Sequence, residues 1–219
     1  MLDNSRAENW LLDLVVTFRY PLCVLTHKET ELLLNREGHG LSETELLGVL
    51  HRLFSDGLLI ASRYTPDEAE VYFSPTMNEI KSGLNPREVG EEVDYGLTQE
   101  GGKIWEARSH PNWEKYLTGS YGMDAGEIIS MDTNLARKAL LFETRWRQSW
   151  DLISNPLWDV LSPWEATYWK TLPLGHRVRF EGTHFSEEQE QETPEESRQY
   201  YAALRQWSEE RDSWRTRPW

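Results

Sequence analysis

The sequence predicts an α+β protein, mostly helical, in which a domain at residues 1–110 is followed by a smaller, tryptophan-rich α+β region at residues 111–219. Three observations support this prediction. Helix-starting capping boxes recur through the first half, short apolar segments between them have the pattern of strands, and ten of the eleven tryptophans fall at or after Trp105. The composition, with 38% hydrophobic and 27% charged residues, is that of an ordinary globular protein.

The first elements are expected to be helix, short strand and helix. The capping box SRAE at residues 5–8 predicts a helix that ends before Pro21, because proline cannot continue a helix. The apolar residues 23–25 are expected to form the short strand. A second capping box, THKE at residues 26–29, predicts a helix that carries the three leucines at 32–34.

The clearest helix follows the capping box SETE at residues 42–45, because leucines then recur on one face. Gly57 is expected to supply its left-handed C-cap. Residues 58–64 read as a strand, residues 65–68 as a turn, and residues 70–74 as the returning strand.

Residues 41–64 (LSETELLGVLHRLFSDGLLIASRY) and residues 95–106 (YGLTQEGGKIWE) resemble the winged helix-turn-helix superfamily. The second segment is similar to the strand-to-helix junction of MarR- and PadR-type repressors, which implies that its tyrosine and leucine pack inward and that Thr98 caps the next helix. The resemblance covers roughly half of the chain, and winged helices serve both as DNA readers and as protein-docking modules. One departure is that residues 75–93, partly helical in pattern, separate the returning strand from YGLT, so either segment is a candidate for the third strand.

In DNA-reading winged helices the third helix enters the major groove and places basic side chains near phosphates. The corresponding helix here begins with Glu43, Thr44 and Glu45, and its outward face continues with His51 and Arg52. Residues 1–108 hold 19 acidic and 10 basic side chains, a balance of −9. Carboxylates near phosphates are repulsive, so the sequence disfavours DNA binding by this domain.

The second half is expected to contain several short elements. A strand is predicted near residues 127–131, a helix from Asp132 or Thr133 to about Trp146, and a strand over residues 175–185. The sequence TPEE at residues 193–196 starts a last helix, preceded by an acidic run that reads either as a solvated linker or as a site for a basic partner. The aromatic and apolar stripe of this helix fits a core or a dimer seam better than a ligand site and consists of Tyr200, Leu204, Trp207 and Trp214.

Charge reverses locally over residues 133–179, where seven basic and four acidic residues give a balance of +3 among many aromatics. Basic residues among aromatics can bind phosphates and stack bases, but their stems can equally cover a tryptophan-rich core, which is the preferred reading. The candidate interaction residues of the whole chain are Glu43, Thr44, His51, Arg52, Arg145, Trp169, Lys170, Arg177 and Arg179.

The sequence carries no signature of catalysis. The six histidines lack metal-binding spacing, and His176 and His184, which bracket one expected strand near Glu181, are read as structural. The single cysteine, Cys23, is expected to be a buried and inert thiol. The sequence therefore predicts no catalytic residue, no cofactor and no metal, and a chain that is not an enzyme.

Formal net charge is −14, from 37 acidic and 23 basic side chains, so the long-range field repels nucleic acid and anionic membranes. Without a signal peptide or a long apolar run, the chain is expected to be cytoplasmic, with no membrane partner.

The leading hypothesis is a non-enzymatic acidic protein-interaction module, an adaptor or an inhibitor of immunity type, built on a winged helix. Its partner would be a protein, with a basic protein as one version and a homodimer as another. The alternative is a winged-helix transcriptional regulator that binds DNA as a dimer, and a remote third reading is an enzyme that uses His176.

Overall fold

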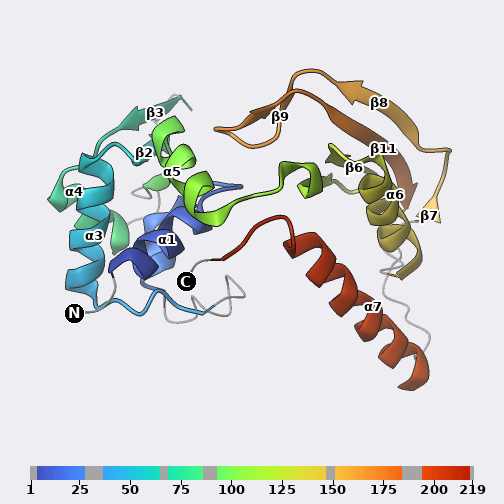
Figure 1. Cartoon of the computed structure of the whole chain (residues 1–219), viewed down its shortest axis with the longest axis horizontal. Helices are drawn as coiled ribbons and strands as arrows, with labels where there is room; N and C mark the ends of the chain where they lie inside the picture. Colours follow the sequence, from blue (N-terminus) through green and yellow to red (C-terminus); the bar gives the residue numbers. More distant parts are fainter. Residues whose placement is uncertain are drawn as a thin grey trace. The chain divides into compact units, whose positions relative to one another are not determined.

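The computed structural model describes residues 4–27, 37–64, 69–85, 93–146, 151–183 and 194–217. Its helices and antiparallel sheets form a mixed α+β structure (Figure 1). The described residues fall into two compact units. The first contains the residues up to His110 together with Thr167–Lys170 and Arg217, and the second contains Pro111–Ala166 and Thr171–Thr216. The helix expected from residue 26 onward, the turn at 65–68 and most of the acidic run before the last helix lie outside the described residues.

The first unit combines helices with a small antiparallel sheet of strand order β1-β4-β2-β3. Its elements in chain order are α1 (Asn4–Leu14), β1 (Tyr20–Pro21), η1 (Leu22–Leu25), α3 (Glu43–Ser55), β2 (Leu59–Tyr64), β3 (Glu70–Phe73), α4 (Met77–Leu84), β4 (Asp94–Leu97) and α5 (Gln99–Ser109).

Two expectations at the start of the chain were wrong. Helix α1 already includes Asn4, so Ser5 lies inside the helix and does not cap it, and the helix ends at Leu14, well before Pro21. The apolar segment after Pro21 is a 3₁₀-helix, η1, and the strand is Tyr20–Pro21 instead. A 3₁₀-helix has three residues per turn, which brings Leu22 and Leu25 to the same side, where both are buried.

Helix α3 confirms the prediction from its capping box. Ser42 and Glu45 make the reciprocal hydrogen bonds of that motif, with the Ser42 backbone N–H donating to Glu45 Oε2 at 2.9 Å. At the other end Gly57 has a φ of +68°, the left-handed conformation expected after a helix C-terminus. Thr76 and Glu79 repeat the capping box at the start of α4.

Both candidates for the third strand pair with β2, on opposite sides of it. On one side β3 forms the outer edge, with Ala61 opposite Phe73, and on the other side β4 places Tyr95 opposite Ala61. Tyr95 and Leu97 are buried, and the Thr98 side chain accepts a hydrogen bond from the backbone of Gly101 at the start of α5. The segment inserted before YGLT, residues 75–93, therefore contributes helix α4 without displacing β4 from the sheet.

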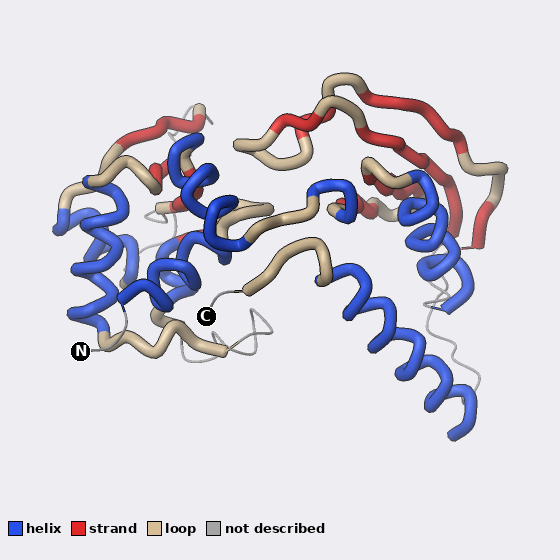
Figure 2. Tube along the Cα trace, in the orientation of Figure 1, coloured by secondary structure: helices blue, strands red, loops and turns tan. Residues whose placement is uncertain are grey.

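The second unit is dominated by an antiparallel sheet that α6 covers on one face (Figure 2). Strands β5, β6 and β11 lie in that order, and β7 and β8 pair with successive parts of the free side of β11. The elements are η2 (Trp113–Lys115), β5 (Leu117–Tyr121), β6 (Ala125–Ser130), α6 (Thr133–Leu141), the π-helical turn η3 (Phe142–Trp146), β7 (Asp151–Leu152), β8 (Leu157–Leu161), β9 (Trp164–Glu165), β10 (Thr171–Leu172), β11 (Gly175–Thr183) and α7 (Pro194–Asp212).

The core of this unit lies between the sheet and its helices. Val178 and Phe180 of β11 point into it, and Trp207 of α7 stacks on Phe142 with ring centroids 5.4 Å apart. Leu204 packs against the same cluster. Leu204 and Trp207 of the stripe on the last helix therefore belong to the core, one of the two roles that the sequence favoured over a ligand site. Because successive side chains of a strand alternate, Arg177 and Arg179 of β11 lie on the opposite face of the sheet from this core.

Candidate functional site

The exposed surface of α3 is acidic, as its sequence indicated. Glu43 and Thr44 are exposed in its first turn, and His51 is half-buried. The guanidinium of Arg52 is ion-paired with Glu8 of α1. Within Glu43–Ser55, all of which is described, Arg52 is the one arginine or lysine, so the helix carries no uncompensated basic side chain.

A second cation of the first unit is also neutralised. The Arg19 guanidinium lies between two aromatic rings, 4.8 Å from the centroid of Tyr72 and 4.6 Å from that of Tyr168, and its Nη1 is 3.0 Å from Glu70 Oε1. Burial opposes ionisation of Glu70, but the hydrogen bond from Tyr72 and the charge of Arg19 outweigh it and lower the pKa of this carboxyl. This stack fixes the β2–β3 hairpin, and the charge of Arg19 is neutralised by Glu70.

Trp169 and Lys170, both candidates from the sequence, are structural parts of the first unit. Trp169 is buried, and its Nε1 donates to the Val16 carbonyl at 2.8 Å. The Lys170 ammonium pairs with Glu106 of α5. Trp169 is thus part of the core of the first unit, and the charge of Lys170 is neutralised by Glu106. The side chain of the third candidate in this stretch, Arg145, lies outside what the structure describes.

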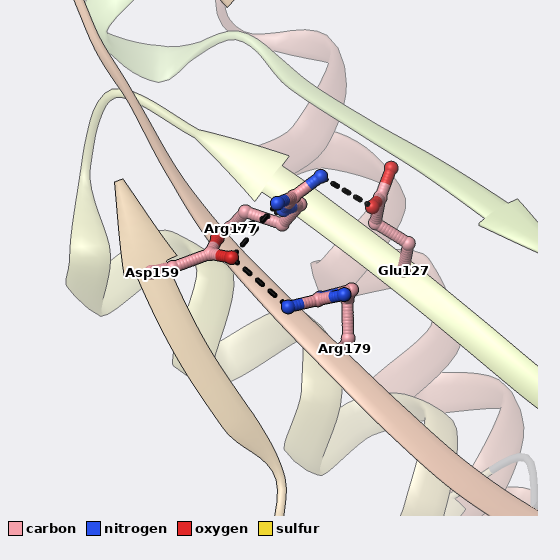
Figure 3. Close-up of polar contacts among 4 residues, drawn as sticks. All are labelled: Glu127, Asp159, Arg177 and Arg179. Carbon is pink, nitrogen blue, oxygen red and sulfur yellow. Dashed lines mark hydrogen bonds and ion pairs between the residues drawn. The ribbon is translucent and has the colours of Figure 1, made fainter. Parts of the chain in front are cut away.

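Arg177 and Arg179 form a charged cluster on the open face of the second sheet (Figure 3). Arg177 binds Asp159 of β8 through two parallel hydrogen bonds of 2.8 Å, Nε to Oδ1 and Nη2 to Oδ2. Arg177 Nη1 lies 3.4 Å from Glu127 Oε2 on β6, and Arg179 Nη2 lies 3.1 Å from Asp159 Oδ2. The strand register explains the cluster, because Arg177 is directly opposite Asp159 and Arg179 directly opposite Glu127.

The cluster is balanced in charge. Hydrogen bonding to Arg177 lowers the pKa of the Asp159 carboxyl, with the charge of Arg179 acting in the same direction, and the bond to Asp159 raises the pKa of Arg177. Two carboxylates against two guanidiniums leave no excess of positive charge to attract phosphate. The basic stretch of the sequence therefore does not become a basic patch here.

A cavity of about 540 Å³ opens beside this cluster. Its walls come from the β5–β6 turn, β11 and the bend at residues 153–156, and its charged lining consists of Glu127, Arg179 and Glu181. Ser120 and Asn155 add neutral polar groups. The charged groups that line the cavity are therefore of both signs.

Strand β8, at the edge of this sheet, is a feature that the sequence reasoning missed. Leu157 is 65% exposed, Val160 is 57% exposed and Trp158 is 40% exposed. Among the described residues, β8 pairs with β11 alone. The available signal was the segment LWDVL, which is apolar around one aspartate and is bounded by Pro156 and Pro163.

The described residues contain no group of three or more histidine, cysteine, aspartate or glutamate side chains that could hold a metal ion. Cys23 is half-buried, whereas the sequence predicted a buried thiol. None of the helices in the described part of the chain has the length and apolar character that crossing a bilayer requires.

Comparison with known proteins gave no match to a family model, to a curated protein or to a solved structure.

Proposed function

We propose that the chain is a non-enzymatic, acidic protein-interaction module, an adaptor or an inhibitor of immunity type, whose first unit is built on a winged-helix-like arrangement. The observation that carries the proposal is the surface of α3, where Glu43 and Thr44 are exposed and Arg52 is held by Glu8. A surface that reads DNA needs cations available to phosphates. This surface suits a basic protein instead.

Two further observations support a protein partner. The net charge of −14 favours encounter with a positively charged surface. The β2–β3 hairpin exposes Tyr64, Val71 and Tyr72, and tyrosine is enriched where proteins contact one another.

The proposal is tested by identifying the partner protein and then reconstituting its complex with the chain from purified components. The tagged chain is used to capture partners from an extract of its own cells at low salt, and the captured protein is identified and purified. Binding is then measured for the wild type, Glu43→Arg and the control Glu209→Arg, which makes the same charge change on the exposed face of α7. We expect Glu43→Arg to raise Kd about ten-fold and the control to change it by less than about two-fold.

The competing function has its own measurement. Fluorescence anisotropy with random-sequence double-stranded DNA and with DNA from the promoter of its own gene should show no binding by the wild type at physiological salt. Tight DNA binding there, lost in Arg63→Ala, would favour the transcriptional regulator. Equal effects of Glu43→Arg and Glu209→Arg on a purified partner would remove α3 from the proposed surface.

A further inference from the structure

The outer edge of the second sheet presents a strand with unused pairing capacity. Strand β8 is antiparallel to β11, with Gly175 opposite Leu161 and Arg179 opposite Leu157. On its other side no described strand pairs with it. Alternate backbone N–H and C=O groups of such an edge point outward and can accept another strand.

The side chains of β8 lack most of the features that protect natural edge strands. Such edges usually carry lysines, prolines or inward-pointing charges that prevent pairing. Within LWDVL the four apolar residues surround a single charge, Asp159, which Arg177 and Arg179 already neutralise. Leu157 on the open face and Val160 on the other face are each more than half exposed. A strand added at this edge would pair with its backbone groups and bring side chains alongside those of β8 on both faces of the sheet.

We infer that β8 pairs antiparallel with β8 of a second copy of the chain, about a two-fold axis that passes Asp159. The segment LWDVL is nearly palindromic in chemical character, so this register is self-complementary. Leu157 then lies opposite Leu161 of the second copy and Trp158 lies opposite its Val160. Pairs of an aromatic and a β-branched residue are favourable across antiparallel strands. An isologous contact of this kind closes after two copies and does not extend into a fibre.

Electrostatics supports the same register. The axis brings the two Asp159 carboxylates opposite each other, and like charges in that position normally repel. Each carboxylate is already bonded to two guanidiniums, at 2.8 Å from Arg177 Nη2 and 3.1 Å from Arg179 Nη2. The axis therefore gathers four guanidinium groups around the two facing aspartates, and the net charge there is not negative. The inference is independent of the proposed function, which rests on α3 in the other unit.

The oligomeric state tests the inference directly. Sedimentation of the full chain, from low micromolar concentration upward, should show a reversible monomer–dimer equilibrium. Val160→Lys should raise the dimer dissociation constant at least about ten-fold, because a lysine at this position would lie in an apolar contact. The matched control is Val71→Lys on β3, an exposed valine on the edge strand of the other sheet, which should leave the equilibrium unchanged.

The register is tested by disulfide trapping in a Cys23→Ala background. Leu157→Cys combined with Leu161→Cys should give a covalent dimer under mild oxidation, because the two positions face each other across the axis. Within one chain they are four strand residues, about 13 Å, apart, too far for an internal bridge. Leu157→Cys combined with Val160→Cys, which do not face each other in this register, should give little product.

A chain that stays monomeric at all concentrations would overturn the inference, and so would a dimer that Val160→Lys does not weaken. Equal trapping of both cysteine pairs would overturn the register. Thermal unfolding of each variant establishes that it is folded, and the cysteine pairs supply the test should Val160→Lys fail to fold.

Discussion

The indole ring of Trp169 lies directly over Gly102 of α5. A Cβ placed on Gly102 would be 2.2 Å from both Cε3 and Cζ3 of that ring. Trp169 also meets Trp105 edge to face, with centroids 6.2 Å apart. Close packing in the core of the first unit therefore requires a glycine at this position.

Gly102→Ala should destabilise the first unit by about 1–3 kcal/mol, because the added methyl group must displace a buried indole. Urea unfolding followed by tryptophan fluorescence measures this. The control is Gly48→Ala, also within a helix but with nothing within 4 Å of the added Cβ. Alanine at position 48 should raise the free energy of unfolding by up to about 1 kcal/mol, since alanine has a higher helix propensity than glycine. Similar losses in both variants would contradict the packing argument.

Tyr168→Phe should lower the free energy of unfolding by about 1–3 kcal/mol although it removes a single oxygen, because two buried backbone groups lose their partner. The Tyr168 hydroxyl donates to the Val15 carbonyl and accepts from the Leu97 N–H, both at 2.5 Å. Burial raises the pKa of this hydroxyl, so it stays protonated and able to donate. Tyr201→Phe on the exposed surface of α7 is the control and should leave the urea midpoint unchanged.

Local signals in the sequence identified most elements of the first unit. Capping boxes such as the one at Ser42 act over three residues, so the chain itself specifies where α3 begins. The role of Trp169 could not be found this way. It depends on contacts with Val16 and Gly102 that are far away in sequence, and an aromatic beside a lysine has the same local pattern in a core as in a binding surface.

Trp207→Ala should destabilise the second unit by about 3–5 kcal/mol, since it removes a large buried side chain that stacks on Phe142. Unfolding monitored by circular dichroism gives the measurement. Tyr201→Ala changes an exposed aromatic on the same helix and should have a small effect. If the two variants proved equally stable, α7 would not be anchored in this core as described.

Strands β5 and β8 were not predicted, and the reason is physical. LTGSY has weak strand propensity, and LWDVL lies between two prolines, so both become strands through pairing with neighbours distant in sequence. The pairing of Arg177 with Asp159 follows from that register alone. The sequence located both arginines but could not show that they are neutralised.

The bidentate pair of Arg177 and Asp159 predicts a defined dependence of stability on pH. Hydrogen bonding to Arg177 lowers the pKa of Asp159 in the folded chain below its unfolded value of about 3.9. A lowered carboxyl pKa contributes stability that is fully present above the unfolded pKa. That contribution is lost as the pH falls through the folded pKa, because protonation removes the charge that Arg177 binds.

Asp159→Asn should therefore lower Tm by the same amount throughout the range from neutral pH to about pH 5, and the difference from the wild type should shrink below about pH 4. Thermal unfolding at a series of pH values measures it, at protein concentrations low enough to keep the chain monomeric. Asp124→Asn, which alters an exposed carboxylate outside the cluster, is the control and should follow the wild type at every pH. A difference for Asp159→Asn that grows as the solution is acidified would mean that the aspartate is not stabilised in its charged form, and the arrangement of this cluster would then be wrong.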